Sequence, residues 1–164
     1  MSENLQPNKL THVNQNGQAN MVDVSQKALT LRIAKASGFV RMNQETLNLV
    51  KANQIQKGDV LSVAKIAGIL AAKKVDDLIP LCHSLPLDSV FVDCVVQASG
   101  ILVCAEAKTS SKTGVEMEAL MAVNITCLTI YDMCKASQKD MTIESIRLDF
   151  KSGGKSGTYI REDK

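Results

Sequence analysis

Aromatic residues are scarce in this chain of 164 residues: they make up 3% of it, and tryptophan is absent. The interior of the fold must therefore be built from valine, isoleucine, leucine, alanine and methionine. A strong excess of one charge is also missing, because the net charge is +2 at pH 7. This balance excludes binding to nucleic acid by bulk electrostatic attraction, so the lysines are expected to act locally.

Membrane-spanning and secretory segments are missing as well. No apolar run reaches the roughly 18 residues of a membrane span without a charge, and no secretory signal is seen. The odd number of cysteines then predicts reduced thiols in the cytosol rather than disulfides. The length suits one domain with a sizeable core. We expect a flexible tail over residues 1–10 and a single domain over residues 11–164.

The hydrophobic pattern predicts an α+β fold with a mostly antiparallel sheet packed with helices. Small residues crowd the second expected helix, so it should lie close against the sheet or another helix. The expected elements are an extended segment over 28–42, a helix from the N-cap Asn43 to Lys51, a helix over 60–75, a hairpin of strands over 87–96 and 101–108, a long helix over 115–136 and a strand over 143–150.

The long helix carries charged residues near its start. Lys112 and Gly114 precede it, and the free N–H groups and dipole of a helix N-terminus attract anions. Glu116 and Glu118 follow in the first turn. Acid–base chemistry explains these two acids no better than simple complementation of the helix dipole, so both interpretations stand.

The other end of this helix carries Asp132 and Lys135, which can pair because they are three positions apart. An ordinary surface pair and a partly buried pair suited to proton transfer are the two alternatives. Glu118 and Asp132 share a helix face within about 40°, but they are about 21 Å apart along the axis. One compact site cannot easily hold both, so we favour a site between subunits over two separate sites.

Three further features invite a functional reading. The Gly/Lys segment Lys151–Gly157 could bind phosphate through its N–H groups and lysines, or be a cationic loop without a ligand. It is not a Walker A loop, because Asp149 stands where the first glycine should be.

His83, after Cys82, is a candidate hydrogen-bond donor, proton carrier or metal ligand, or a loop histidine satisfied by the backbone. A zinc site is not expected, because no C-x-x-C pair exists. Asp23 is an isolated charge in an apolar segment.

Seven segments together resemble one family, the molybdenum cofactor biosynthesis protein C family of cyclic pyranopterin monophosphate synthases. They occur in the family's order and cover nearly the whole chain beyond its tail, which is not expected by chance. The segments are Met21–Ser25, Lys57–Val60, Ile66–Ile69, Leu78–His83, Lys112–Leu120, Leu128–Ala136 and Lys151–Gly157.

The resemblance implies a ferredoxin-like α+β fold and a homohexamer, a trimer of dimers with active sites at subunit interfaces. It implies a cytoplasmic lyase that converts 3′,8-cyclo-7,8-dihydro-GTP into cyclic pyranopterin monophosphate and pyrophosphate, early in molybdopterin synthesis. The partner is then a small nucleotide-derived substrate, with no nucleic acid and no membrane. No cofactor is required, and the sequence leaves open whether Mg²⁺ accompanies the triphosphate.

The resemblance also implies roles for individual residues. Asp132 matches the family's catalytic acid/base, Lys135 its partner, and Lys57 a further catalytic lysine; no metal ligand is expected. The substrate-binding set comprises Asp23, Leu81, Cys82, His83, Glu116, Met117, Glu118 and Lys151.

Two positions depart from the family's pattern. Asn20 replaces a histidine found in many members, so it cannot carry a proton, and Ser84 replaces a proline that follows the Cys-His pair. Two rival interpretations are a nucleotide or phosphate sensor, which needs the cations but not Asp132, and a structural module without any ligand.

Overall fold

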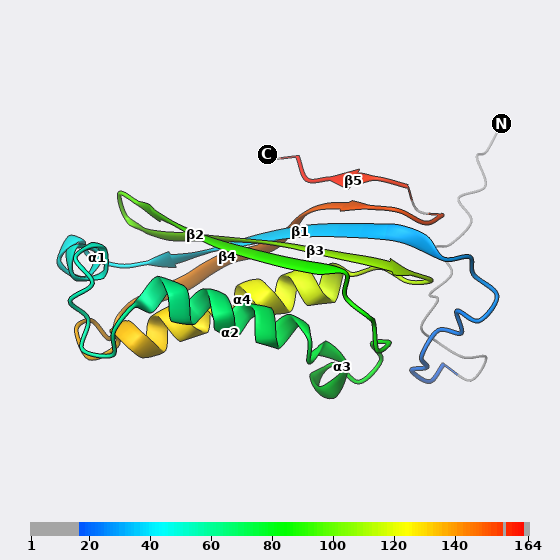
Figure 1. Ribbon diagram of the computed structural model, residues 1–164, viewed down its shortest axis with the longest axis horizontal. Coiled ribbons are helices and arrows are strands. Elements are labelled where there is room, and N and C mark those ends of the chain that lie inside the picture. Colours follow the sequence, from blue (N-terminus) through cyan, green and yellow to red (C-terminus); the bar gives the residue numbers. More distant parts are fainter. Residues whose placement is uncertain (1–16, 156, 163–164) are drawn as a thin grey trace.

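The computed structural model describes residues 17–155 and 157–162, so the expected tail over residues 1–10 lies outside the described residues. Three helices follow the first strand, and a fourth helix lies between two pairs of strands (Figure 1). In order they are β1 Thr30–Arg41, α1 Gln44–Lys51, α2 Val60–Ala72, α3 Val75–Leu78, β2 Ser89–Gln97, β3 Gly100–Ser111, α4 Glu116–Cys134, β4 Thr142–Ser152 and β5 Tyr159–Ile160.

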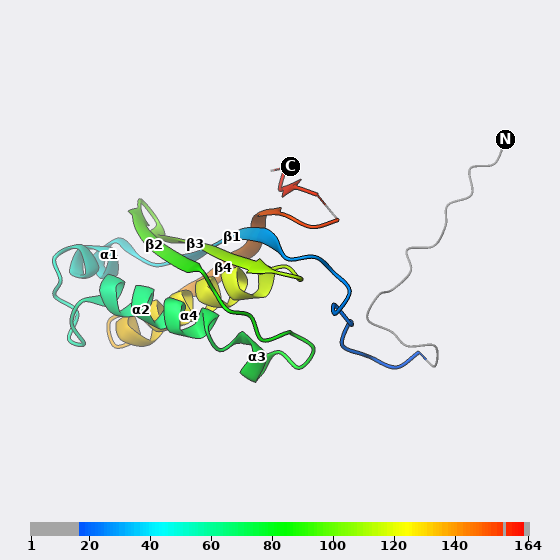
Figure 2. The same cartoon turned by 45° about the vertical axis from the view of Figure 1, so that its right-hand side comes forward.

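The strands form one antiparallel sheet in the order β2-β3-β1-β4-β5. Helices α2 and α4 lie side by side on one face of it, and Figures 1 and 2 show both beneath the strands. The β-α-β-β-α-β sequence with β1 and β3 at the centre is the ferredoxin-like arrangement. The expected fold class is therefore confirmed.

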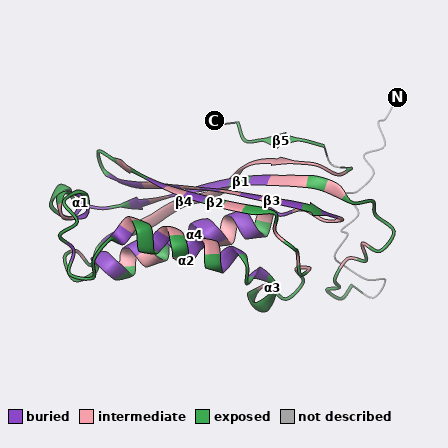
Figure 3. Ribbon diagram, viewed as in Figure 1, coloured by how far each residue is buried: buried purple, intermediate pink, exposed green. Residues whose placement is uncertain are grey.

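Helix α4 is the centre of the core, packed against the sheet on one side and against α2 along its flank. Figure 3 shows buried residues along α4 and on the strands above it. By length and hydropathy α4 could cross a membrane, and half of it is buried inside the fold. Its fully buried residues include Ala119, Ala122, Val123, Cys127 and Ile130.

Helices α2 and α4 approach each other closely at Gly68, as the small residues of α2 predicted. A Cβ atom at Gly68 would lie 2.8 Å from the Ala122 carbonyl oxygen and would overlap the Thr126 hydroxyl. That hydroxyl donates to the same carbonyl over 2.7 Å. Only glycine therefore fits at this crossing without a shift of α2 away from α4.

The helix starts follow from their capping residues. Asn43 accepts a hydrogen bond of 2.8 Å from the backbone of Thr46, which confirms it as the N-cap of α1. Asp59 accepts from the backbone of Ser62 over 3.0 Å and caps α2 in the same way. Asp59 is thus explained by helix capping, and it fixes the position at which the preceding loop enters α2.

Several element boundaries differ from expectation. The helix predicted over 60–75 ends at Ala72, because the chain turns at Lys73 and Lys74 and brings Val75 into the core as the start of α3. Strand β3 continues past Lys108 to Ser111 by pairing with β1. Strand β4 includes Lys151 and Ser152, which were expected in a loop, and the short β5 was not predicted.

Candidate active site

The predicted site residues fall into two groups at opposite ends of α4 (Figure 1). Lys57, Asp132 and Lys135 lie at its C-terminal end. The rest lie around its N-terminal end, where the start of β1, the loop after α3 and the end of β4 meet. No single chain brings the two groups together, since Glu118 and Asp132 are about 21 Å apart along the helix axis.

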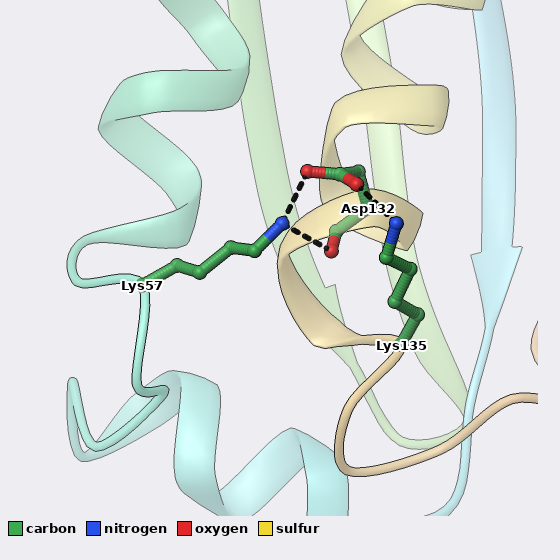
Figure 4. A network of polar contacts seen from close by, with 3 residues as sticks. All are labelled: Lys57, Asp132 and Lys135. Carbon is green, nitrogen blue, oxygen red and sulfur yellow. Dashed lines mark hydrogen bonds and ion pairs between the residues drawn. The ribbon is translucent and has the colours of Figure 1, made fainter.

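At the C-terminal end, Asp132 holds two ammonium groups (Figure 4). Lys57 Nζ lies 2.6 Å from Asp132 Oδ2 and also donates to the Asp132 carbonyl oxygen over 3.1 Å. Lys135 Nζ lies 2.7 Å from Asp132 Oδ1. Lys57 comes from the loop before α2, and Lys135 is the C-cap of α4. The loop before α2 and the C-terminal end of α4 together therefore build this group of Lys57, Asp132 and Lys135, which we call the Asp132 cluster.

The Asp132 cluster is charged and open to solvent. Hydrogen bonds from Lys135 and Lys57 lower the pKa of Asp132 to about 2, and the bond to Asp132 raises the pKa of Lys135. All three side chains are about half exposed. Within one chain, Asp132 and Lys135 therefore form an exposed pair rather than a partly buried one. At neutral pH Asp132 is therefore a carboxylate, able to accept a proton and to orient two proton donors.

At the N-terminal end of α4, a cavity of about 860 Å³ opens between β1, β4 and the Lys112–Gly114 turn. Among the residues that the structure describes, five cationic side chains and one carboxylate line it. The one carboxylate is Glu116, whose Oε1 accepts a hydrogen bond of 2.9 Å from Lys151 Nζ. The charged lining is Lys27, Arg32, Lys112, Glu116, Lys151 and Lys155. This excess of positive charge suits a polyanionic ligand.

Arg32 is a cavity residue that the sequence did not single out. Its Nε and Nη2 donate to the carbonyl oxygens of Ser111 and Lys112 over 3.4 and 3.3 Å. Gly153 and Gly154, with φ of 100° and 73°, wrap its other side, and a Cβ at Gly153 would lie 2.9 Å from Arg32 Cδ. Arg32 therefore joins two turns that line the cavity. The signal in the sequence that could have pointed to Arg32 was a charged residue within an apolar strand.

Beside the cavity lies a buried carboxyl group. Glu118 is 4% exposed, and burial, reinforced by Glu116 and Asp76, raises its pKa to about 7. Burial and the charge of Glu118 also raise the pKa of the half-buried Cys82 thiol. Glu118 thus differs from Asp132, because its environment allows it to hold a proton near neutral pH.

The remaining predicted residues do not line the cavity. His83 Nε2 lies 2.9 Å from the Val22 carbonyl oxygen, so the alternative of a loop histidine satisfied by the backbone fits its contact. Asp23 accepts a hydrogen bond of 2.8 Å from the Ser25 backbone, which lowers its pKa. Leu81 and Met117 are partly exposed. Of the expected binding set, Glu116 and Lys151 reach the cavity itself.

Among residues 17–155 and 157–162, no three His, Cys, Asp or Glu side chains gather closely enough to hold a metal ion. The five cysteines are free thiols, as expected. Three of these thiols are buried: Cys94, Cys127 and Cys134.

Comparison with known proteins gives a family match. Residues 21–154 match the sequence model of the MoaC family. The chain is 55% identical over 155 residues to the cyclic pyranopterin monophosphate synthase of Methylobacterium sp. (strain 4-46). It is 56% identical over 152 residues to the protein of the same name from Novosphingobium aromaticivorans. Each alignment covers 93% of this chain and 97% of the relative.

Proposed function

This chain belongs to the MoaC family, and from that premise we propose that it is a cyclic pyranopterin monophosphate synthase. It is a lyase that converts 3′,8-cyclo-7,8-dihydro-GTP into cyclic pyranopterin monophosphate and pyrophosphate, in molybdenum cofactor biosynthesis. The observation that carries this proposal is the cavity with five cations and one carboxylate at the N-terminal end of α4.

The triphosphate of the substrate occupies this cavity. Arg32 offers a planar guanidinium, and Lys27, Lys151 and Lys155 offer ammonium groups to phosphate oxygens. The neighbouring N-terminus of α4 adds free N–H groups and the positive end of the helix dipole. Charge that develops on the departing pyrophosphate is stabilised by the same groups.

The Asp132 cluster supplies proton transfer. Asp132 is ionised and serves as the base. Lys57 and Lys135 donate protons and stabilise negative charge in the transition state. On the cavity side, Glu118 is the group suited to give or take a proton near neutral pH. Leu81, Cys82, His83 and Met117 flank the part of the substrate that carries the rings.

We propose that the complete site forms between subunits of a homohexamer built as a trimer of dimers. The length of α4 supports this, since it separates Asp132 from Glu118, beside the cavity, by about 21 Å within one chain. In the assembly the Asp132 cluster of one subunit meets the cavity of its neighbour. The half-exposed state of Asp132 in the single chain fits a group that a neighbour covers.

The reaction as proposed requires no cofactor, and the enzyme acts in the cytoplasm without a nucleic-acid or membrane partner. The net charge of +2 supports the lack of a nucleic-acid partner. Removing divalent ions with a chelator tests the remaining question of Mg²⁺: a fall in turnover that Mg²⁺ alone restores would assign it to the triphosphate.

The decisive experiment is direct turnover. The purified protein is incubated with the cyclised dihydro-GTP substrate, and cyclic pyranopterin monophosphate and pyrophosphate are followed by mass spectrometry and a phosphate assay. Equal amounts of the two products are expected. Binding of substrate or pyrophosphate without any product would instead identify a sensor, with Asn20 and Ser84 the first positions to restore to histidine and proline. Absence of any thermal stabilisation by these ligands would identify a structural module.

A further inference from the structure

The segment that leads into β1 is exposed, yet it contributes to the cavity. We call residues 22–28 the strap; Figure 2 shows this blue segment leaving the sheet and running outside the body of the fold. Gln26, Lys27 and Ala28 of the strap are exposed and line the cavity. With so little apolar burial, the position of the strap depends on its hydrogen bonds.

Two side chains from distant parts of the chain hold the strap. His83 Nε2 meets the Val22 carbonyl oxygen at 2.9 Å, 61 positions away in sequence. Lys112 Nζ donates to the Ser25 carbonyl oxygen over 2.7 Å, 87 positions away. Both bonds end on backbone oxygens, so they fix the path of the strap whatever its side chains are.

The strap also has internal order between these two attachments. Asp23 Oδ1 accepts from the Ser25 backbone over 2.8 Å, and the Lys27 backbone donates to the Val24 carbonyl over 3.0 Å. These bonds form a turn that directs the Ser25 carbonyl to Lys112 and carries Lys27 to the cavity. Asp23 is thereby explained as a residue that shapes the turn rather than one that lines the cavity.

We infer that the strap closes over the anion in the cavity and that His83 and Lys112 are the positioning residues that hold it closed. The anion is the triphosphate or pyrophosphate of the proposed function, on which this inference rests. A carbonyl oxygen only accepts, so Nε2 of His83 is the donor in its contact with Val22. Release of the two bonds opens the cavity and withdraws Lys27 from it.

Limited proteolysis of the full-length protein tests this inference without turnover. Trypsin cleaves after Lys27 when the strap is open, and cleavage after Lys74, in the turn before α3, serves as an internal reference. Loss of one such hydrogen bond should raise the cleavage rate at Lys27 about fivefold. We therefore compare His83→Ala, Lys112→Met and the double variant with wild type, and expect about 25-fold for the double variant if the two effects are independent.

Conservative variants separate positioning from general destabilisation. His83→Gln and Lys112→Arg keep a donor within reach of the same carbonyls, so their cleavage at Lys27 should return toward the wild-type rate. An unchanged rate at Lys27 in the double variant would overturn the inference. Equal acceleration at Lys27 and Lys74 would do the same, because the whole fold would then be loosened.

Inorganic pyrophosphate tests closure over the anion. It should slow cleavage at Lys27 in the wild-type protein and leave cleavage at Lys74 unchanged; no effect at Lys27 would overturn closure. In turnover, the double variant should raise KM more than it lowers kcat. The two proposals can fail separately. If the cleavage rates at Lys27 change as expected but the protein forms no product, the synthase function is contradicted and the role of the strap is not.

Discussion

Lys57 donates a hydrogen bond of 2.6 Å to the carboxylate of Asp132, although 75 positions separate the two residues. This contact joins the loop before α2 to the last turn of α4. The same lysine also donates to the Asp132 carbonyl oxygen over 3.1 Å, so its ammonium is held by two acceptors. The Asp132 cluster therefore joins three charged side chains from two elements rather than two neighbours on one helix.

Asp132→Asn should lower kcat on the order of 10²- to 10⁴-fold, because it removes a general base and loosens both lysines. Pyrophosphate binding, measured by calorimetry, should be retained. Asp93→Asn is the matched control, since Asp93 forms an equally short ion pair of 2.7 Å with Lys65 away from either group. Wild-type turnover in Asp132→Asn would contradict its catalytic role.

Glu118→Gln should change the pH dependence of stability. The folded state holds the Glu118 proton up to about pH 7, whereas the unfolded chain releases it near 4.5. Glu118 therefore costs stability progressively as the pH rises from about 4.5 to 7, and the cost then levels off. Urea unfolding should show the variant gaining up to about 3 kcal/mol over wild type across this window. A constant difference between the two proteins from pH 4.5 to 8 would argue against the raised pKa.

Lys151→Gln should weaken pyrophosphate binding by roughly 10- to 100-fold, because it removes a charge-assisted donor from the cavity. Lys35→Gln is the matched control: Lys35 pairs with Glu106 at 3.0 Å and does not line the cavity. Titration calorimetry compares the two variants with wild type. Equal losses in both would mean that general surface charge, not the cavity, binds the anion.

Mixed oligomers test the site between subunits. Asp132→Asn and Glu118→Gln should each be nearly inactive alone. Because the two residues lie at opposite ends of α4, co-assembled variants should contain some sites with both groups intact and regain turnover. The mixed oligomers are made by unfolding the two variants together and refolding them. As the control, each variant is unfolded and refolded alone. Failure of a demonstrably mixed oligomer to regain turnover would place both residues in the same subunit's site.

Gly68→Ala should destabilise the fold by about 1–3 kcal/mol in urea unfolding, because its Cβ overlaps Thr126 and the Ala122 carbonyl. Helix propensity alone predicts the opposite, a gain of about 1 kcal/mol. Ala67→Gly, on the neighbouring position of α2, measures that propensity at a less crowded place. Gly68→Ala as stable as wild type would show that α2 shifts freely on α4.

Much of the fold could be predicted because periodicity and capping residues are local signals. Asn43 accepts a hydrogen bond from Thr46, as its position predicted. The small residues of α2 predicted its close approach to α4 at Gly68. The end of α2 was wrong because the turn at Lys73 and Lys74 serves a distant contact, the burial of Val75 in the core. Strand β5 was missed because two residues carry too little pattern.

The candidate site was less accessible to sequence reasoning. The charges at both ends of α4 and their separation followed from helix geometry, and the pairing of Asp132 with Lys135 is confirmed. Arg32 was missed because its role depends on carbonyls about 80 positions away. The sequence left open whether the Asp132–Lys135 pair is an ordinary surface pair or partly buried, and within one chain Asp132 is half exposed. Exposure depends on neighbours that spacing along a helix does not reveal. The assignment of roles to the binding residues stays a prediction.

The position of α4 in the chain bears on how the protein is made. This helix is the most apolar long segment of the fold, and it packs on α2, α3, β1, β2 and β3, all of which precede it. When α4 leaves the ribosome, most of its packing surface has already been synthesised, and only β4 is still to come. The order of elements therefore shortens the time for which this long apolar helix of the nascent chain is without its packing partners.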